Sequence, residues 1–460
     1  GRVAEGKIIR SVKIMKKTLI LIVCVVVLSS LNWAGKPGVF EKNWAQWRGP
    51  LSTGVSPQGN PPLEWSESKN VRWKIALPGK GHATPIIWGD QVFIATAVET
   101  AKVGKPQEKD EGEQRSHRWM SPTKTDKIQK YILLSIDRKT GKILWQKILK
   151  EEWPREGRSH GLGSWASNSP VTDGKHVYAY FGSRGLYCLD MKGNLKWKRD
   201  FGQMNKRMTF GEGSSPVLYG DRIIVQWDHE GPSFLYILDK KTGKDIQKIE
   251  RDEPTSWSTP LVVEYKGKPQ VITGATKFVR SYDLNTGKLL WKVTGLTPNV
   301  IPQPMEAHGL VYLASGFRGN AMFVIRLSAA KGDITGTEAI AWKLDKNTPY
   351  TPSMVVYDNI LYMLKSNKGI LSCYDAKTGK EHYSAQRFEG MSEVYASPVA
   401  AKGRVYFTGH KGTMYVIEHS VKFKVLAKNQ LDDTFNASPA IVGSEMFLRG
   451  YKNLYCIAKK

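Results

Sequence analysis

Cysteine and histidine are scarce in this chain of 460 residues, which has 4 cysteines and 9 histidines. No CxxC or CxxCH sequence and no adjacent pair of cysteines occurs. The chain therefore lacks the patterns of a cysteine-type zinc site and of covalent haem attachment. It also lacks an HExxH sequence, a phosphate-cradling glycine loop and the sequence context of a serine–histidine triad. These absences exclude the metal and catalytic sites that short motifs identify.

An apolar run long enough to span a membrane is also missing. The run Thr18–Leu28 follows Lys16 and Lys17 and is short compared with the roughly 20 residues of a membrane-spanning helix. A basic pair before such a run is typical of a secretory signal. We expect residues 1–35 to contain upstream residues and a signal peptide or anchor, with cleavage near Ala34. The expected location is the periplasm or another exported site in the cell envelope.

Acidic residues are fewer than basic ones. The chain has 42 Asp and Glu and 68 Lys and Arg, which gives a net charge of +26. A surface of this kind attracts anionic partners such as lipid head groups, polyanions or an acidic protein. It is equally compatible with a well-solvated basic surface. Charge therefore indicates no specific partner, and no specific nucleic-acid target.

Repeats dominate the rest of the sequence. One phrase, D-x-x-T-G-K, occurs in IDRKTGKILW, LDKKTGKDIQ, YDLNTGKLLW and YDAKTGKEHY. A second phrase has Ser, Thr or another residue before a proline, then apolar residues, a turn and a strand. Its prolines recur at an interval of about 45 residues, with one longer first gap, at Pro85, Pro170, Pro216, Pro260, Pro304, Pro352, Pro398 and Pro439.

Each repeat contains four short strands, A to D, which is the signature of a propeller blade. The last repeat stops after strand C, and the segment Asn70–Gly79 near the front resembles a strand D. We therefore predict an all-β, eight-bladed propeller of four-stranded antiparallel blades, closed by this N-terminal strand. Residues 36–460 form this single domain, and the polar segment 99–130 is a loop insertion in the first blade.

The repeated residues have structural roles. Glycine in the C–D turn supplies a positive φ, and the preceding Asp and Thr bind the turn backbone. A tryptophan at the end of strand D is large enough to wedge between blades. The residues predicted for this place are Trp145, Trp197, Trp291, Trp342 and, from the closing strand, Trp73, whereas Gln247, Tyr383 and Leu426 mark degenerate blades. We predict buried free thiols at Cys188, Cys373 and Cys456, which occupy equivalent places in separate repeats.

These repeats resemble the pyrroloquinoline-quinone (PQQ) type propeller repeat over nearly all of Trp44–Lys460, and the opening WAQWRGPLSTGVSP is similar to secreted PQQ-like propellers. The resemblance implies one of two branches. Quinoprotein dehydrogenases hold PQQ and calcium at the propeller axis, but they carry adjacent cysteines that this chain lacks. Outer-membrane assembly scaffolds of BamB type use no cofactor, but they are usually anchored through a cysteine that is missing here.

Strand order places the B–C and D–A loops on one face, and we expect function on that varied face. Aromatic residues precede strand A at Trp165, Phe210, Trp257, Tyr350, Tyr395 and Phe435. Basic residues in the B–C loops are Arg184, His229, Lys277, Arg318, Lys368 and Lys411. Together they suggest a funnel lined by rings and rimmed by positive charge. The alternative is that the rings pack between blades and the basic residues are ordinary turn residues.

Two functions follow from these residues. The first is a non-catalytic envelope scaffold without a cofactor. It is a monomer that binds envelope proteins, acidic ones among them, with outer-membrane protein assembly as its candidate role. The second is a small quinoprotein oxidoreductase with PQQ and calcium, for which Glu212, Asn299 and Glu306 are weak metal-ligand candidates. No catalytic residue is assigned. Carbohydrate binding by the aromatic mouth is a third interpretation.

Overall fold

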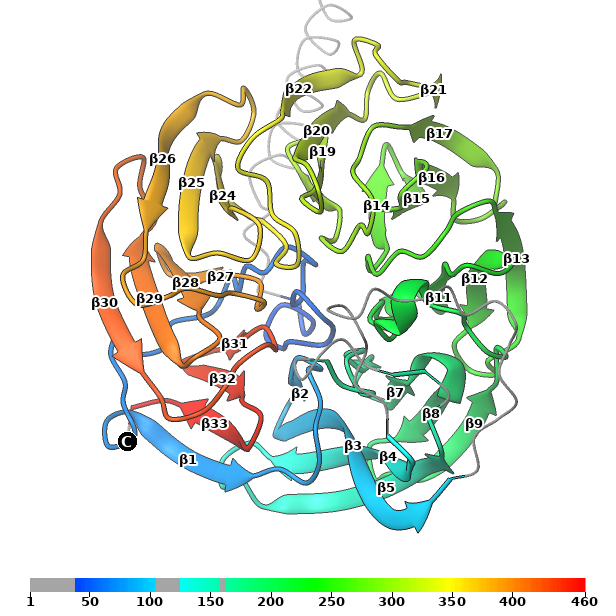
Figure 1. Ribbon diagram of the computed structural model, residues 1–460, viewed down its shortest axis with the longest axis vertical. Coiled ribbons are helices and arrows are strands. Elements are labelled where there is room, and N and C mark those ends of the chain that lie inside the picture. Colours follow the sequence, from blue (N-terminus) through cyan, green and yellow to red (C-terminus); the bar gives the residue numbers. More distant parts are fainter. Residues whose placement is uncertain (1–37, 105–124, 155, 158–162, 460) are drawn as a thin grey trace, which may run out of the picture.

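The computed structural model describes residues 38–104, 125–154, 156–157 and 163–459. Within these ranges the chain forms eight sheets arranged in a ring (Figure 1), as the repeats predict. The segment expected to be a signal peptide or anchor lies outside the described residues. None of the described helices has both the length and the apolar character needed to cross a membrane.

The first four blades follow one another along the chain. Blade 1 contains β2 (Ile86–Trp88), β3 (Gln91–Val103), β4 (Lys127–Asp137) and β5 (Ile143–Glu152). Blade 2 contains β6 (Val171–Thr172), β7 (His176–Tyr180), β8 (Leu186–Asp190) and β9 (Leu195–Arg199). Blade 3 contains β10 (Val217–Tyr219), β11 (Arg222–Trp227), β12 (Ser233–Asp239) and β13 (Asp245–Arg251). Blade 4 contains β14 (Leu261–Tyr265), β15 (Lys268–Thr273), β16 (Val279–Asp283) and β17 (Leu289–Val293), with β21 (Gly332–Asp333) added in parallel to its outer edge.

The other four blades complete the ring. Blade 5 contains β18 (Met305–Ala307), β19 (Leu310–Ser315), β20 (Ala321–Arg326) and β22 (Ile340–Leu344). Blade 6 contains β23 (Val355–Tyr357), β24 (Ile360–Leu364), β25 (Ile370–Asp375) and β26 (Glu381–Arg387). Blade 7 contains β27 (Val399–Ala401), β28 (Arg404–Thr408), β29 (Thr413–Glu418) and β30 (Val425–Gln430). Blade 8 contains β31 (Ala440–Val442), β32 (Glu445–Arg449), β33 (Asn453–Ile457) and β1 (Val71–Ala76). Two 3₁₀ turns, η2 (Gly182–Arg184) and η3 (Arg207–Thr209), lie in loops.

The N-terminal strand closes the ring. Strand β1 pairs antiparallel with β33, with Trp73 opposite Cys456, and Figure 1 shows the blue strand outside the red ones. The predicted closing strand is therefore confirmed. Pairing the two ends of the chain in one sheet removes the open edges that a linear array of blades would expose.

The repeated C–D turn is built as its residues predict. In blade 1 a carboxylate oxygen of Asp137 accepts hydrogen bonds from the backbone N–H and the hydroxyl of Thr140, each at 2.7 Å. Gly141 follows with φ of 76°, a conformation that glycine adopts at little cost. Asp239, Asp283 and Asp375 bind their own turns in the same way.

Of the predicted wedge tryptophans, Trp73, Trp145, Trp197 and Trp342 contact the turn of the next blade, whereas Trp291 donates to Gln270 in its own blade. A Cβ added to Gly193 would lie 2.9 Å from the ring of Trp145, so this ring covers the turn of blade 2. The indole N–H of Trp145 also donates to the carbonyl of Met191 at 3.0 Å. Blade 3 has Gln247 in place of a tryptophan, as the sequence predicts, yet this side chain still contacts the next blade. The Gln247 amide donates to the carbonyl of Asn285 at 2.7 Å and takes over the polar half of this contact.

The insertion in blade 1 begins as strand. The β3–β4 hairpin pairs Glu99 with Gln129 and Val103 with Lys127, so both ends of the segment 99–130 extend the sheet and are not loop as predicted. Backbone pairing needs no apolar pattern at an exposed hairpin tip, which is why the composition did not indicate it. Residues 105–124 lie outside the described residues.

The core lies between the blades and contains the three cysteines of the described chain. Cys188, Cys373 and Cys456 are free and buried, as predicted. Burial raises the pKa of each thiol to about 12. These side chains therefore stay protonated at neutral pH and pack as small apolar groups.

Candidate functional site: the axial cavity

An N-terminal segment closes the propeller axis from the face of the A–B and C–D turns. We call residues 44–60 the axial plug. Trp44 exchanges two backbone hydrogen bonds with Ile87 in blade 1. Further along, Ala400 in blade 7 donates to Gly54 and accepts from Ser56. Ala45 also accepts from the backbone N–H of Thr172 in blade 2, and Arg48 donates to the carbonyl of Met354, which precedes the first strand of blade 6. Because blades 2 and 6 face each other across the ring, the plug crosses the axis, and Figure 1 shows it in blue at the centre.

A cavity of about 500 Å³ lies above the plug, on the face of the D–A and B–C loops. This volume is in the range of small-molecule sites. Four of the predicted aromatic residues line it, namely Phe210, Trp257, Tyr350 and Tyr395. Sequence reasoning missed two further rings, Trp47 from the plug and Phe317 from a B–C loop. Phe317 stacks on Tyr350 with ring centroids 5.2 Å apart.

Two predicted aromatic residues lie elsewhere. Phe435 is completely buried and packs on Tyr455, with ring centroids 5.8 Å apart, so the alternative of packing inside the ring holds for this residue. Trp165 lines a smaller hollow beside the cavity, where its indole N–H donates to the Glu156 carbonyl at 3.1 Å. The aromatic wall therefore comes from four of the six predicted positions.

Of the predicted basic residues, Arg318 lines the cavity. Its side chain is exposed and lies over the Phe317 ring at 5.3 Å. Lys277, Lys368 and Lys411 are exposed but do not contribute to the cavity lining. His229 is buried, its Nδ1 accepts from the backbone N–H groups of Asn205 and Gly231, and burial lowers its pKa. The rim at the cavity itself is thus less basic than predicted.

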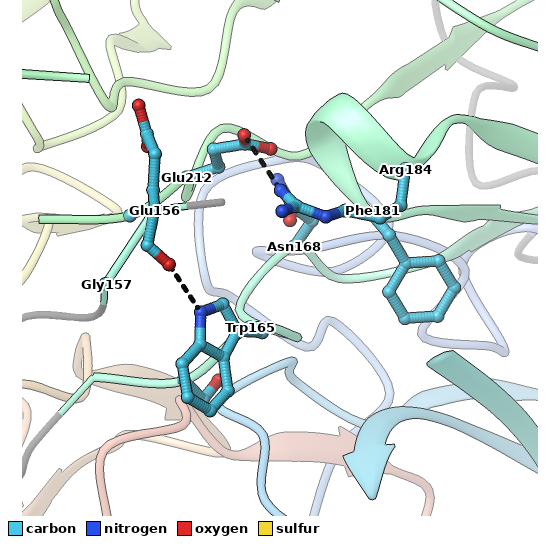
Figure 2. Close-up of a pocket in the computed structure, with 9 residues that line it drawn as sticks. Glu156, Gly157, Trp165, Asn168, Phe181, Arg184 and Glu212 are labelled. Carbon is cyan, nitrogen blue, oxygen red and sulfur yellow. Dashed lines mark hydrogen bonds and ion pairs between the residues drawn. The ribbon is translucent and has the colours of Figure 1, made fainter. Parts of the chain in front are cut away.

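Arg184 is also buried, in a cluster of charges beside the cavity that Figure 2 shows. A guanidinium nitrogen of Arg184 lies 3.5 Å from Glu212, whose carboxylate also accepts from the hydroxyl of Ser183 at 2.5 Å. The nearby Glu156 accepts from the backbone N–H of Lys206 at 2.6 Å. Burial, with the charge of Glu212, raises the pKa of Glu156 to about 7. This hollow has a volume of about 10 Å³, room for a single water molecule.

A second buried pair lies deeper in blade 3. Asp228 and Arg251 are both fully buried, and two nitrogens of Arg251 donate to the two carboxylate oxygens at 2.8 and 3.0 Å. Burial opposes ionisation of Asp228, but Arg251 holds its pKa below the usual value. Lys206 lies nearby, with its ammonium 5.7 Å from the Trp257 ring centroid, and burial lowers its pKa. Arg251 neutralises Asp228, whereas the ammonium of Lys206 donates to the backbone carbonyls of Asp228 and Ser256 below the Trp257 ring.

The weak metal candidates are not brought together. Glu212 lies in a D–A loop, whereas Glu306 lies in β18 and accepts from Gly309 in the A–B turn, toward the opposite face. Asn299 is buried. Within the described ranges no group of three or more His, Cys, Asp or Glu side chains is placed to hold a metal ion.

A ring of hydroxyl groups surrounds the axis, and sequence reasoning missed it. At most junctions a residue next to the proline donates its backbone N–H to the hydroxyl of the equivalent residue in the next blade; this residue precedes the proline except in blade 6, where Ser353 follows Pro352. Six such bonds, of 2.9 to 3.0 Å, join Thr84 to Ser169, Ser169 to Ser215, Ser215 to Thr259, Gln303 to Ser353, Ser353 to Ser397 and Ser397 to Ser438. The signal was the Ser or Thr that stands beside the repeated proline.

A sequence model of the family described as outer membrane protein assembly factor BamB matches residues 129–291 and 233–460. A curated relative, the outer membrane protein assembly factor BamB of Shewanella oneidensis, is 25% identical over 148 residues, which are 31% of this chain. The match spans about a third (32%) of the length of that relative.

Solved structures with a similar fold include proteins of two kinds that bear on function. BamB from Moraxella catarrhalis superposes with a TM-score of 0.55 and 11% identity, over 84% of this chain and 98% of that one. Quinohemoprotein alcohol dehydrogenase from Comamonas testosteroni has a TM-score of 0.60 and 10% identity, over 91% and 81%. At such identities the likeness concerns the fold alone.

Proposed function

Because this chain belongs to the family described as outer membrane protein assembly factor BamB, we propose that it is a non-catalytic scaffold of the cell envelope. Its role is to hold partner proteins, in the assembly of outer-membrane proteins. One observation carries this proposal beyond the family relation. The axial cavity opens among the varied loops of one face, while the plug and the uniform T-G-K turns cover the other. A closed ring of this kind is a rigid platform with one distinctive side.

The chemistry of the partner follows from the loop face. Arg318, Lys277, Lys368 and Lys411 are exposed there, and the chain carries a net charge of +26. Such a surface attracts acidic segments and speeds their association. We therefore propose that the protein is exported to the periplasm, acts as a monomer and binds acidic envelope proteins.

The alternative is a quinoprotein oxidoreductase with PQQ and calcium in the axial cavity, for which the similarity in fold to the Comamonas enzyme argues. PQQ is a tricarboxylate, and calcium prefers six to eight oxygen ligands. Among the described residues that line the cavity, Arg318 is the only arginine or lysine and Glu212 the only carboxylate. That carboxylate is already bound by Ser183 and Arg184. These residues do not fit the quinone–calcium pair, and the scaffold is the function that they support better.

The test is capture of envelope proteins by the purified propeller with charge reversal on either face. We expect Arg318→Glu combined with Lys368→Glu to abolish capture of specific partners at 0.15 M salt. The matched control, Lys241→Glu combined with Lys377→Glu in the C–D turns of the opposite face, should leave capture unchanged. Equal losses in both variants, or no specific partner, would contradict the proposal. Saturable binding of PQQ with calcium, together with dye-coupled alcohol oxidation, would establish the alternative instead.

A further inference from the structure

Four serines of the hydroxyl ring offer donors to the cavity: Ser169 and Ser215 on the side of Glu212, and Ser397 and Ser438 on the opposite side. Ser397 and Ser438 line it, although their relative exposures are 2% and 6%. The oxygen of each accepts a backbone N–H from the preceding blade, but no acceptor for its own proton exists among the described residues. A buried donor without an acceptor is costly. A ligand oxygen placed here would satisfy both hydroxyl groups.

Two buried positive charges lie behind the wall, Arg48 beside Ser397 and Arg449 beside the lining residue His82. Arg48 of the plug donates to the carbonyl of Pro398, which follows Ser397, and to that of Met354, each at 2.6 Å. Arg449 in blade 8 donates to the carbonyl of Ala95 at 2.5 Å. Neither guanidinium has a carboxylate within ion-pair distance in the described part of the chain. Burial lowers the pKa of both to about 9, so both remain protonated at neutral pH.

The cavity is therefore polarised. Carbonyl groups solvate the two guanidinium groups but do not neutralise them, and a positive charge in a medium of low dielectric acts over several ångströms. The opposite side of the cavity carries the carboxylate of Glu212. An anion is favoured at Ser397 and Ser438, and neutral groups are favoured toward Glu212.

The other lining residues indicate what kind of molecule carries the anionic group. Six Trp, Phe and Tyr side chains line the wall, and Ile301 is the one aliphatic side chain among the described lining residues. Neutral groups that both donate and accept hydrogen bonds stand between the rings, at Thr351, Asn367 and Asn436. Sugar rings present C–H faces that stack on aromatic rings, and their hydroxyl groups both donate and accept. An apolar peptide side chain would find little aliphatic surface here.

We propose that the axial cavity binds an acidic sugar, a uronate, with its carboxylate at Ser397 and Ser438 and its ring against the aromatic wall. This site is independent of the scaffold role, because it requires no protein partner. It uses the hydroxyl ring for recognition as well as for joining the blades. The plug contributes to it from below through Trp47 and Arg48.

Isothermal titration of the purified protein tests this assignment. The probes are a disaccharide of glucuronic acid and glucose, which has one carboxylate, and its methyl ester, which has none. We expect saturable binding of the acid and at least about tenfold weaker binding of the ester. The double variant Ser397→Ala with Ser438→Ala should bind the acid about tenfold more weakly and bind the ester as the wild type does. Trp257→Ala should weaken the binding of both probes.

A matched control separates recognition from folding. Ser353→Ala removes the same kind of bond between blades, but Ser353 does not line the cavity. The affinity of this variant for the acid should therefore equal that of the wild type. Equal affinities for acid and ester, no binding of either, or binding that survives the double serine variant through surface charge alone would overturn the assignment. Equally tight binding of the dipeptide N-acetyl-Tyr-Glu-amide would show a peptide site and would also overturn it.

Discussion

The buried pair of Asp228 and Arg251 provides a sharp test of how blade 3 is held together. The carboxylate of Asp228 accepts from Gln226 at 2.7 Å and Ser256 at 2.8 Å as well as from Arg251. The remaining guanidinium nitrogen of Arg251 donates to Thr273 at 2.8 Å and to the Tyr282 hydroxyl at 3.0 Å. Every charged group of this pair thus has partners, and neither side chain is exposed to solvent.

Asp228→Asn should lower the free energy of unfolding by about 3–5 kcal/mol at pH 7. The reason is that the change leaves the fully buried guanidinium of Arg251 without its counter-charge, and an unpaired buried charge strongly destabilises the folded state. Replacing both partners by apolar side chains, Asp228→Leu with Arg251→Met, should cost less than the two single changes together, because no unpaired charge stays buried. It still leaves the four neutral partners without the pair, at about 1 kcal/mol or more each, so we expect a net loss, but a smaller one than the sum of the two single variants.

Urea denaturation followed by tryptophan fluorescence measures these differences. The pH dependence provides a second readout with a definite sign. Because the pKa of Asp228 in the folded protein is below its usual 3.8, its contribution is complete above that pH and is lost as the pH falls through the lower folded value. Asp228→Asn should remove this acid-side loss. A cost under about 1 kcal/mol for Asp228→Asn, or a double variant whose loss equals the sum of the singles, would refute the reasoning.

Three further predictions concern the turns, the wedges and the charges beside the cavity. Gly379→Ala should destabilise by at least about 1 kcal/mol more than Gly403→Ala in thermal unfolding, because both have positive φ but a Cβ at Gly379 would lie 2.6 Å from Trp342. Trp197→Gln should lose about 1 kcal/mol less than Trp197→Ala in urea, because the amide can renew the hydrogen bond to the next turn, as the glutamine of blade 3 does. Stability should fall as the pH rises from 5 to 8, by at most about 3 kcal/mol, because the pKa of Glu156 is raised from 4.5 to about 7. Glu156→Gln should remove that dependence, and an unchanged pH profile in this variant would contradict its cause.

The candidate site was only partly predictable. Phe210 and Phe435 both precede an inner strand, yet one lines the cavity and the other is buried on Tyr455. Their spacing from the following proline differs, and the direction of a loop side chain depends on the neighbouring blade. Arg184 was predicted at the rim from its place in a B–C loop. In the structure its side chain is buried, because it pairs with the buried carboxylate of Glu212.

The sequence by itself determined the blade, the number of blades and the way the ring closes. These properties come from local periodicity, from turns that need Asp, Thr and Gly, and from a missing last strand, and all of these are visible in one dimension. Tertiary structure alone decided that residues 44–60 cross the axis, that the serines beside the prolines join blade to blade, and that Arg48 and Arg449 lie behind the cavity wall. Contacts of this kind join residues from 41 to 354 positions apart, and no local pattern encodes which of them meet at the axis.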